Sequence, residues 1–177
     1  MSKIDFQKLD IMDALDLAVL IEEEAEERYA QFVQQLGSRY TGDAGDVFSA
    51  MVKNEVQHKN QLLERRKKLF GNAKVRVNRD MIWDVEAPSQ NAHRAFMSAY
   101  EAMEVALQGE IKAYEFFVQA LKVVKDEKVR GLFSELRDEE LQHQNLLKKW
   151  MDSHKGDKGP DRSSDPSDGD SDEPPGL

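Results

Sequence analysis

Two short segments of this chain carry the same pair of residues that can bind metal ions. The segment EVQHKNQLL places Glu55 three residues before His58, and the segment ELQHQNLL places Glu140 three residues before His143. Residues three apart lie on one face of a helix, so each Glu-x-x-His sequence aims a carboxylate and an imidazole in the same direction. A single pair of this kind more often lies on a solvated helix face, and the repetition makes the pattern informative.

Both segments lie inside apolar patterns of helical period, which predict four long amphipathic helices and an all-α fold. The predicted elements are helices at about 10–36 and 43–70, a third that begins after Pro88 with Ser89 as its N-cap, and a fourth that begins near Asp126. Residues 10–70 and about 95–150 match each other in register, as in EAEERYAQFVQQL and EIKAYEFFVQAL. The chain is therefore predicted to contain two copies of one helical hairpin.

The segment NAKVRVNRDMIWDVEAPSQ separates the second predicted helix from the third. It is too long for a tight turn, but a four-helix bundle with one long crossover needs such a connection, because its second and third helices run parallel. Val75, Val77, Ile82 and Trp83 are predicted to anchor this crossover on the bundle.

Acidic residues interrupt the apolar pattern at the middle of every predicted helix. The polar residues at core positions are Glu22, Glu55, His58, Glu110, Glu140 and His143. Counting from the turns puts the two glutamates of each hairpin at the same height, about fifteen residues or roughly 22 Å from the turn. All six side chains should therefore meet in one layer of the core.

Four buried carboxylates without partners would each cost several kcal/mol, whereas two divalent cations would balance their charge. Carboxylates can bridge two such ions roughly 3.5–4 Å apart. The mixed oxygen and nitrogen ligand set suits Fe or Mn, with Zn as an alternative. We therefore predict a two-metal site.

The composition limits the remaining choices. The chain has 177 residues, no cysteine and a net charge of −9, so it has no thiolate metal site and would be repelled by nucleic acid. No stretch is apolar enough to span a bilayer and no signal peptide is recognisable, which predicts a cytoplasmic protein. Residues 1–150 are predicted to form the bundle. Residues 151–177, with eight acidic and three basic residues and four of the five prolines, are predicted to be a disordered acidic tail.

The body of the chain resembles the ferritin-like superfamily, and most closely the di-iron domain of the rubrerythrins. Ferritin-like di-iron proteins take one glutamate from each of two helices and a Glu-x-x-His from each of the other two. The resemblance implies that Glu55 and Glu140 bridge two iron ions. It further implies that Glu22 and His58 complete one ion, Glu110 and His143 the other, and that Tyr29 hydrogen-bonds to the site.

Three departures from the family pattern bear on the chemistry. The chain lacks the four cysteines of a rubredoxin-like domain, so we expect an external electron-donor protein. Position 113, where rubrerythrins tend to carry an extra glutamate, is Ala113, so the centre resembles the six-ligand site of bacterioferritin and peroxide specificity is in question. Val56 replaces the methionine through which bacterioferritin binds haem, so no haem is expected.

The resemblance implies a di-iron peroxidase or oxidase that acts in oxidative-stress defence, as a homodimer or larger homo-oligomer, with H2O2 or O2 as its oxidant. Two Fe(II) ions can each give one electron to an O–O unit, and Glu22 and Glu110 would be the mobile terminal ligands. The alternatives are ferroxidase activity for iron storage or detoxification, and a bundle in which the metal is only structural.

Overall fold

Four long helices make up most of the chain in the computed structural model, which describes residues 4–36, 44–82, 85–90, 92 and 97–155. They are α1 (Ile11–Leu36), α2 (Ala44–Phe70), α3 (Ala99–Val123) and α4 (Glu127–Ser153), and a short 3-10 helix, η1 (Arg79–Met81), lies between α2 and α3. The described residues contain no strand, so the predicted all-α fold is confirmed. None of the described helices has the length and apolar character needed to cross a membrane.

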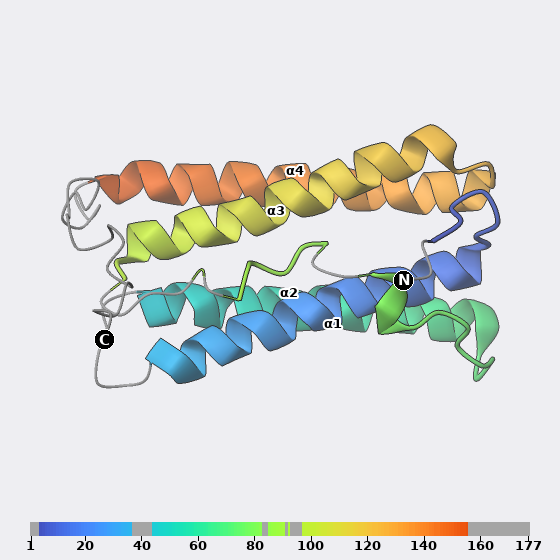
Figure 1. Ribbon diagram of the computed structural model, residues 1–177, viewed down its shortest axis with the longest axis horizontal. Helices are drawn as coiled ribbons and strands as arrows, with labels where there is room; N and C mark the ends of the chain where they lie inside the picture. The colour runs from blue at the N-terminus through green and yellow to red at the C-terminus, as the bar shows by residue number, and fades with distance from the viewer. Residues whose placement is uncertain (1–3, 37–43, 83–84, 91, 93–96, 156–177) are drawn as a thin grey trace, which may run out of the picture.

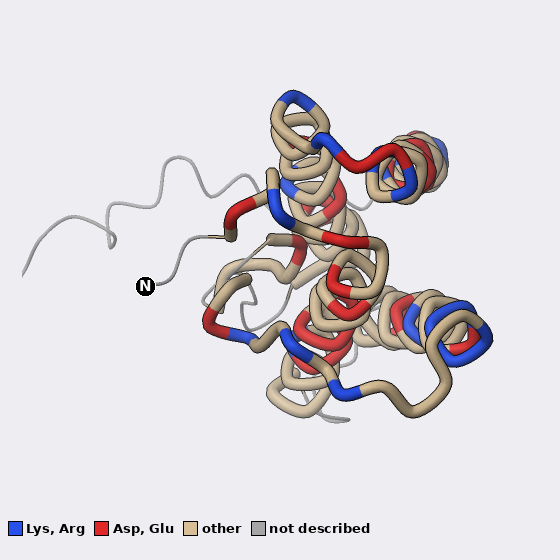
Figure 2. The backbone as a smooth tube through the Cα atoms, turned by 90° about the vertical axis from the view of Figure 1, so that its right-hand side faces the viewer, with Lys and Arg blue, Asp and Glu red and all other residues tan. Residues whose placement is uncertain are grey.

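The helices are arranged as two hairpins. Helices α1 and α2 pack along each other, as do α3 and α4, and α2 and α3 run in the same direction (Figure 1). The connection that this direction requires, residues 71–98, is called the crossover below. Its first residues stay at the end of α2, where Arg66 donates hydrogen bonds to the carbonyls of Gly71 and Ala73. From η1 onward its described part lies beside α1 and α3, on the side away from α2 and α4 (Figure 2).

Three of the four predicted helix starts agree with the structure to within a residue. Asp126 is the N-cap of α4, and its carboxylate accepts hydrogen bonds from the backbone N–H groups of Lys128 and Val129. Gly71 follows the last residue of α2 with a φ of 56°, a conformation that glycine adopts without strain. Residues 37–43, between α1 and α2, lie outside the described part of the chain.

The predicted start of the third helix is wrong. Helix α3 begins at Ala99, and its N-cap is Ser98 rather than Ser89. The Ser98 hydroxyl accepts a hydrogen bond from the backbone N–H of Glu101, and the Glu101 carboxylate accepts one from the backbone N–H of Ser98. This reciprocal capping box needs an acidic residue three positions after the serine. Ser89 has Ala92 there, and its carbonyl instead accepts from the Ala92 N–H in a turn.

The crossover is anchored by fewer apolar residues than predicted. Ile82 is only 3% exposed, which confirms it as an anchor, whereas Val75 is 51% exposed and was wrongly predicted as one. Val77 is half-buried, and Trp83 lies outside the described residues. Val75 is exposed because ion pairs, rather than apolar contacts, attach this part of the crossover: Arg76 pairs with Asp10 and Asp13 at the start of α1.

The core is divided into two apolar clusters along the length of the bundle. The first includes Leu15, Ile21, Phe117, Leu132, Phe133 and Leu136. The second includes Phe32, Phe48, Met51, Met103, Ala106 and Leu147. Each long helix contributes to both clusters, and its central acidic residue lies between the two contributions, so a polar layer crosses the bundle near mid-height.

Helix α4 ends at Ser153, three residues past the predicted boundary of the bundle at residue 150. The rest of the predicted tail, residues 156–177, lies outside the described part of the chain, and its disorder stays a prediction.

The capping box can be tested by substitution. Ser98→Ala removes a cap that accepts a hydrogen bond at the start of α3, and it should lower the free energy of unfolding by about 1 kcal/mol. Ser89→Ala is the matched control, because Ser89 caps no described helix, and it should change stability by less than half as much. Chemical denaturation followed by circular dichroism measures both, and equal losses would contradict the assignment.

Candidate metal centre

The structure brings all six predicted ligand residues together in the polar layer. Two groups of three side chains each offer ligand atoms within 4.8 Å of one another. The first group is Glu22, Glu55 and His58, and the second is Glu110, Glu140 and His143. These are the two trios that the repeated hairpin predicts, one from each hairpin, so each hairpin supplies one half of the centre.

The two histidines lie against each other on the α2 and α4 side of the layer. Their imidazole rings stack with centroids 4.7 Å apart and an angle of 6° between the ring planes. His143 Nδ1 lies 3.3 Å from a carboxylate oxygen of Glu110 and 3.6 Å from one of Glu140, and His58 Nδ1 lies 3.6 Å from Glu22. The Nδ1 atom of each histidine therefore faces the carboxylates of its own trio.

A fifth carboxylate, that of Glu86 in the crossover, also lies in this layer, and sequence reasoning missed it. It forms one group with Glu22 and Glu140 and another with Glu55 and Glu110, again with ligand atoms within 4.8 Å. Glu86 thus joins residues of both hairpins. The crossover has no helical period to reveal an inward-facing residue.

One signal in the sequence could have pointed to this contact. Gly109 is an isolated glycine in the middle of α3, where glycine is unfavourable unless another backbone approaches closely. A Cβ atom added at Gly109 would lie 2.8 Å from the carbonyl oxygen of Glu86. The glycine that precedes Glu110 therefore makes room for the crossover.

The buried polar atoms of this layer fit a metal site. One carboxylate oxygen in each of four glutamates is buried without a hydrogen-bond partner among the described residues; they belong to Glu22, Glu55, Glu86 and Glu140. Unpartnered buried carboxylate oxygens are costly, and bound cations would offset that cost. The two trios can hold one ion each, with hard oxygen donors and one imidazole per trio.

Burial and mutual repulsion disfavour the charged forms of these acids in the metal-free protein. Burial raises the pKa of Glu55, Glu86 and Glu140 well above the ordinary 4.5, and the neighbouring carboxylates raise it further. Burial lowers the pKa of His58, but the Glu22 carboxylate beside it outweighs that effect, and the pKa rises overall. The layer therefore attracts cations or protons.

Tyr29 lies on α1 close to the carboxylates of this layer, but the hydrogen bond to the site that the family resemblance implies is not formed among the described residues. Its side chain is fully buried, and its hydroxyl has no hydrogen-bond partner among the residues described. Burial raises the pKa of Tyr29 well above 10, and the charge of Glu110 is the next largest cause. The phenol is therefore protonated at neutral pH, with a donor available next to the carboxylates.

A cavity of about 140 Å³ reaches the centre from the side of α2 and α4. Glu22 and His58 of the metal centre line it, and so does Glu139. Its rim includes Arg65 and Glu135, which are exposed and form an ion pair at 2.8 Å between α2 and α4. A molecule of a few atoms, or a hydrated metal ion after losing water, can therefore reach the imidazole side of the layer from solvent.

The bundle with a carboxylate–histidine layer at mid-height defines a ferritin-like protein. The chain belongs to the rubrerythrin family, whose profile matches residues 13–158. A similar solved structure is an uncharacterized conserved protein from Magnetospirillum magnetotacticum MS-1, with a TM-score of 0.63 and 22% identity, covering 82% of this chain and 95% of that one. This likeness supports the fold. The comparison with curated proteins found no match.

The raised carboxyl pKa values predict how the metal-free protein responds to pH. Glu140 ionises near pH 4.5 in the unfolded chain but only at higher pH in the fold, so its contribution to stability is intact below pH 4.5 and is lost as the pH rises. Glu140→Gln should therefore become increasingly stable relative to the wild type between pH 5 and 8, by up to about 1.4 kcal/mol per pH unit.

Thermal unfolding of chelator-treated protein across this pH range measures the effect. Glu104→Gln is the control, because Glu104 is exposed on α3 and belongs to none of the ligand groups. Its stability relative to the wild type should stay nearly constant. A difference between Glu140→Gln and wild type that did not grow with pH would contradict the prediction.

Proposed function

We propose that this chain binds two iron ions in the carboxylate–histidine layer and uses them to reduce H2O2 or O2. The observation that carries the proposal is the pair of buried Glu-Glu-His trios, one from each hairpin, with carboxylate oxygens that lack hydrogen-bond partners. Membership of the rubrerythrin family supports iron as the metal and an oxidoreductase as the class of activity.

A pair of ferrous ions supplies two electrons, which is the number that cleaves the O–O bond of peroxide to water or takes O2 to the peroxide level. The residues of the chain bind and enclose that pair. Glu22 with His58 and Glu110 with His143 would complete the two ions, and Glu55 and Glu140 would bridge them. The apolar clusters on either side keep bulk water from the layer along the bundle axis.

Two further features suit the proposed reaction. The protonated Tyr29 hydroxyl has a hydrogen to donate and no partner among the described residues, so it could donate a hydrogen bond to a carboxylate of the layer. The cavity beside His58 admits H2O2 or O2, which need little space. We propose that a separate protein returns the electrons, because the 177 residues contain no cysteine with which to hold an iron–sulfur reductant.

The metal pair can be tested by counting ions. Glu55→Ala should abolish paired binding, because it removes a proposed bridging carboxylate and leaves the trio with one glutamate and one histidine. Glu140→Ala should do the same in the other hairpin. Equilibrium dialysis of the metal-free proteins against Fe(II) without oxygen, followed by elemental analysis, gives the stoichiometry.

The control is Glu104→Ala, which should keep two ions per chain and the rise in melting temperature that Fe(II) gives the wild type. Retention of two ions by Glu55→Ala or Glu140→Ala would contradict the bridging roles. An unchanged melting temperature of the wild type on Fe(II) addition would count against a buried site.

The oxidant can be identified by stopped-flow absorbance. Anaerobic protein loaded with Fe(II) is mixed in parallel with H2O2 and with O2, and formation of the ferric pair is followed. Oxidation at least tenfold faster with H2O2 is expected for a peroxidase. Comparable or faster oxidation with O2 would instead favour an oxidase or ferroxidase, and release of the ferric iron would distinguish those two.

A further inference from the structure

We propose that Glu86 is a fifth carboxylate ligand of the metal pair, supplied by the crossover, and that its charge favours the ferric over the ferrous form of the pair. This inference rests on the proposed function and goes beyond it, because four glutamates and two histidines already account for a complete centre.

Contacts on both sides fix the crossover backbone at Glu86. The Glu86 carbonyl lies against Gly109 of α3, where no side chain could fit without a shift. The next carbonyl, of Ala87, accepts a hydrogen bond of 2.8 Å from Lys112 of α3, and that of Pro88 accepts one of 2.5 Å from Arg28 of α1. Three successive residues are thus tied to the two helices that flank the crossover.

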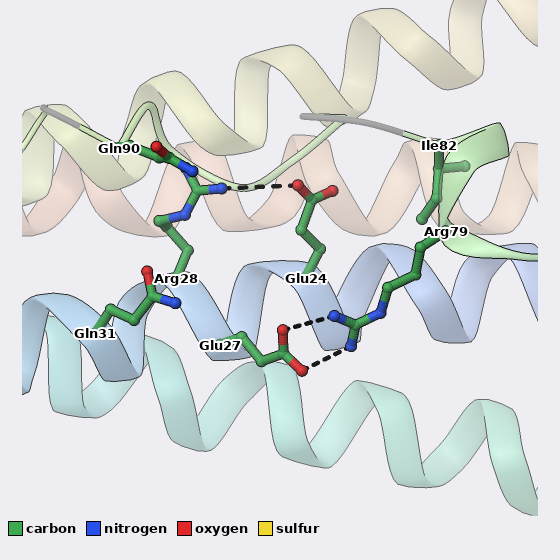
Figure 3. Close-up of a pocket in the computed structure, with 7 residues that line it drawn as sticks. All are labelled: Glu24, Glu27, Arg28, Gln31, Arg79, Ile82 and Gln90. Atoms are coloured by element: carbon green, nitrogen blue, oxygen red, sulfur yellow. Dashed lines mark hydrogen bonds and ion pairs between the residues drawn. The ribbon is translucent and has the colours of Figure 1, made fainter. Parts of the chain in front are cut away.

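The crossover is also fastened before Glu86. Arg79 in η1 forms an ion pair with Glu27 of α1 at 2.6 Å (Figure 3). It forms a second ion pair with Glu23 of α1 at 3.0 Å, and Ile82 is buried. The cavity of about 160 Å³ shown in Figure 3 lies along this attachment. Two of its lining residues attach the crossover to α1: Arg79 pairs with Glu27, and Arg28 donates to the Pro88 carbonyl. Arg28 also pairs with Glu24 of the same helix.

Glu86 reaches the layer from the side opposite the histidines. Its segment is bonded to α1 and α3, whereas His58 and His143 come from α2 and α4. The side chain is 3% exposed, and one carboxylate oxygen has no hydrogen-bond partner among the described residues. It shares ligand-distance groups with four other glutamates, two in each hairpin. A carboxylate in this position can coordinate either ion or both.

Formal charge sets the expected effect. Four carboxylates and two neutral imidazoles balance two divalent ions and leave a charge of +2 with two trivalent ions. A fifth carboxylate changes these totals to −1 and +1. Charge is poorly screened in a buried layer, so the added carboxylate stabilises the trivalent pair and destabilises the divalent pair. Position 113 in α3 is alanine and cannot supply an extra acid. In this centre the extra acid is Glu86, which comes from the crossover.

The test compares the wild type with Glu86→Gln in a mediated equilibrium titration, with dithionite as the reductant of the ferric pair. Glutamine keeps the shape and the backbone contacts but removes the charge. Glu86→Gln should shift the Fe(III)/Fe(II) equilibrium at least tenfold toward Fe(II), which is about 59 mV for a one-electron couple. It should still bind two ions per chain in dialysis against Mn(II), because the two trios are intact.

Two variants complete the design. Glu24→Gln is the control for charge, because Glu24 lies on α1 near the same segment but in none of the ligand groups, and it should shift the equilibrium less than threefold. Gly109→Ala pushes the Glu86 backbone away without changing any charge, and it should shift the equilibrium in the same direction as Glu86→Gln. Gly109→Ala also tests the role of Glu86 if the Glu86→Gln variant does not fold.

The outcomes separate the two proposals. An equilibrium in Glu86→Gln equal to that of the wild type or of Glu24→Gln, with two ions bound to each, would overturn the role of Glu86 and leave the metal pair standing. If Glu86→Gln fails to fold, an unshifted equilibrium in Gly109→Ala would overturn it in the same way. Wild-type protein that binds fewer than two ions would overturn the proposed function itself.

Discussion

Burial of five carboxylates in one layer is the constraint on which the rest of this structure depends. Glu22, Glu55, Glu86, Glu110 and Glu140 are each at most 5% exposed, and each has a carboxylate oxygen within 4.8 Å of an oxygen of at least two of the others. Like charges at this distance repel strongly in a core that screens them poorly. The metal-free fold must therefore keep some of these acids protonated, and cations would remove the repulsion directly. Stability and metal binding are thus coupled through one set of side chains.

Burial of the apolar clusters offsets the energetic cost of keeping these acids in the core. The clusters lie on either side of the carboxylate layer along the bundle axis, and all four long helices contribute to both. A helix that buries apolar residues above and below its central glutamate cannot turn that glutamate outward without exposing both sets. The apolar residues therefore fix the direction of the acids, and the helices position the ligands more rigidly than loops would. The resulting centre is prearranged for ions, at the expense of stability in their absence.

The sequence predicted the parts of this structure that follow a period. The four helices and the six repeated ligand residues were recognisable because acidic residues interrupted a regular apolar pattern. Glu86 was not, because it lies in an irregular segment and because four carboxylates already balanced two divalent ions. The start of α3 was misplaced for a different reason. The sequence Ser98-x-x-Glu101 carries the full capping signal, but the proline at position 88 drew the predicted boundary to Ser89.

The position of Glu86 also changes how the symmetry of the chain should be understood. The two hairpins each contribute a Glu-Glu-His trio, so helices alone would give an approximately twofold symmetric centre. Glu86 has no counterpart in the repeat. It groups with Glu22 and Glu140 and also with Glu55 and Glu110, and each of these pairs contains one glutamate from each hairpin. A single residue can do this only near the axis that relates the hairpins. The crossover covers the layer on the side of α1 and α3, whereas the cavity and the partly exposed imidazoles leave the side of α2 and α4 accessible. The centre therefore has two unlike faces, one occupied by a carboxylate and one that small molecules can approach, although the two hairpins that build it are nearly repeats of each other.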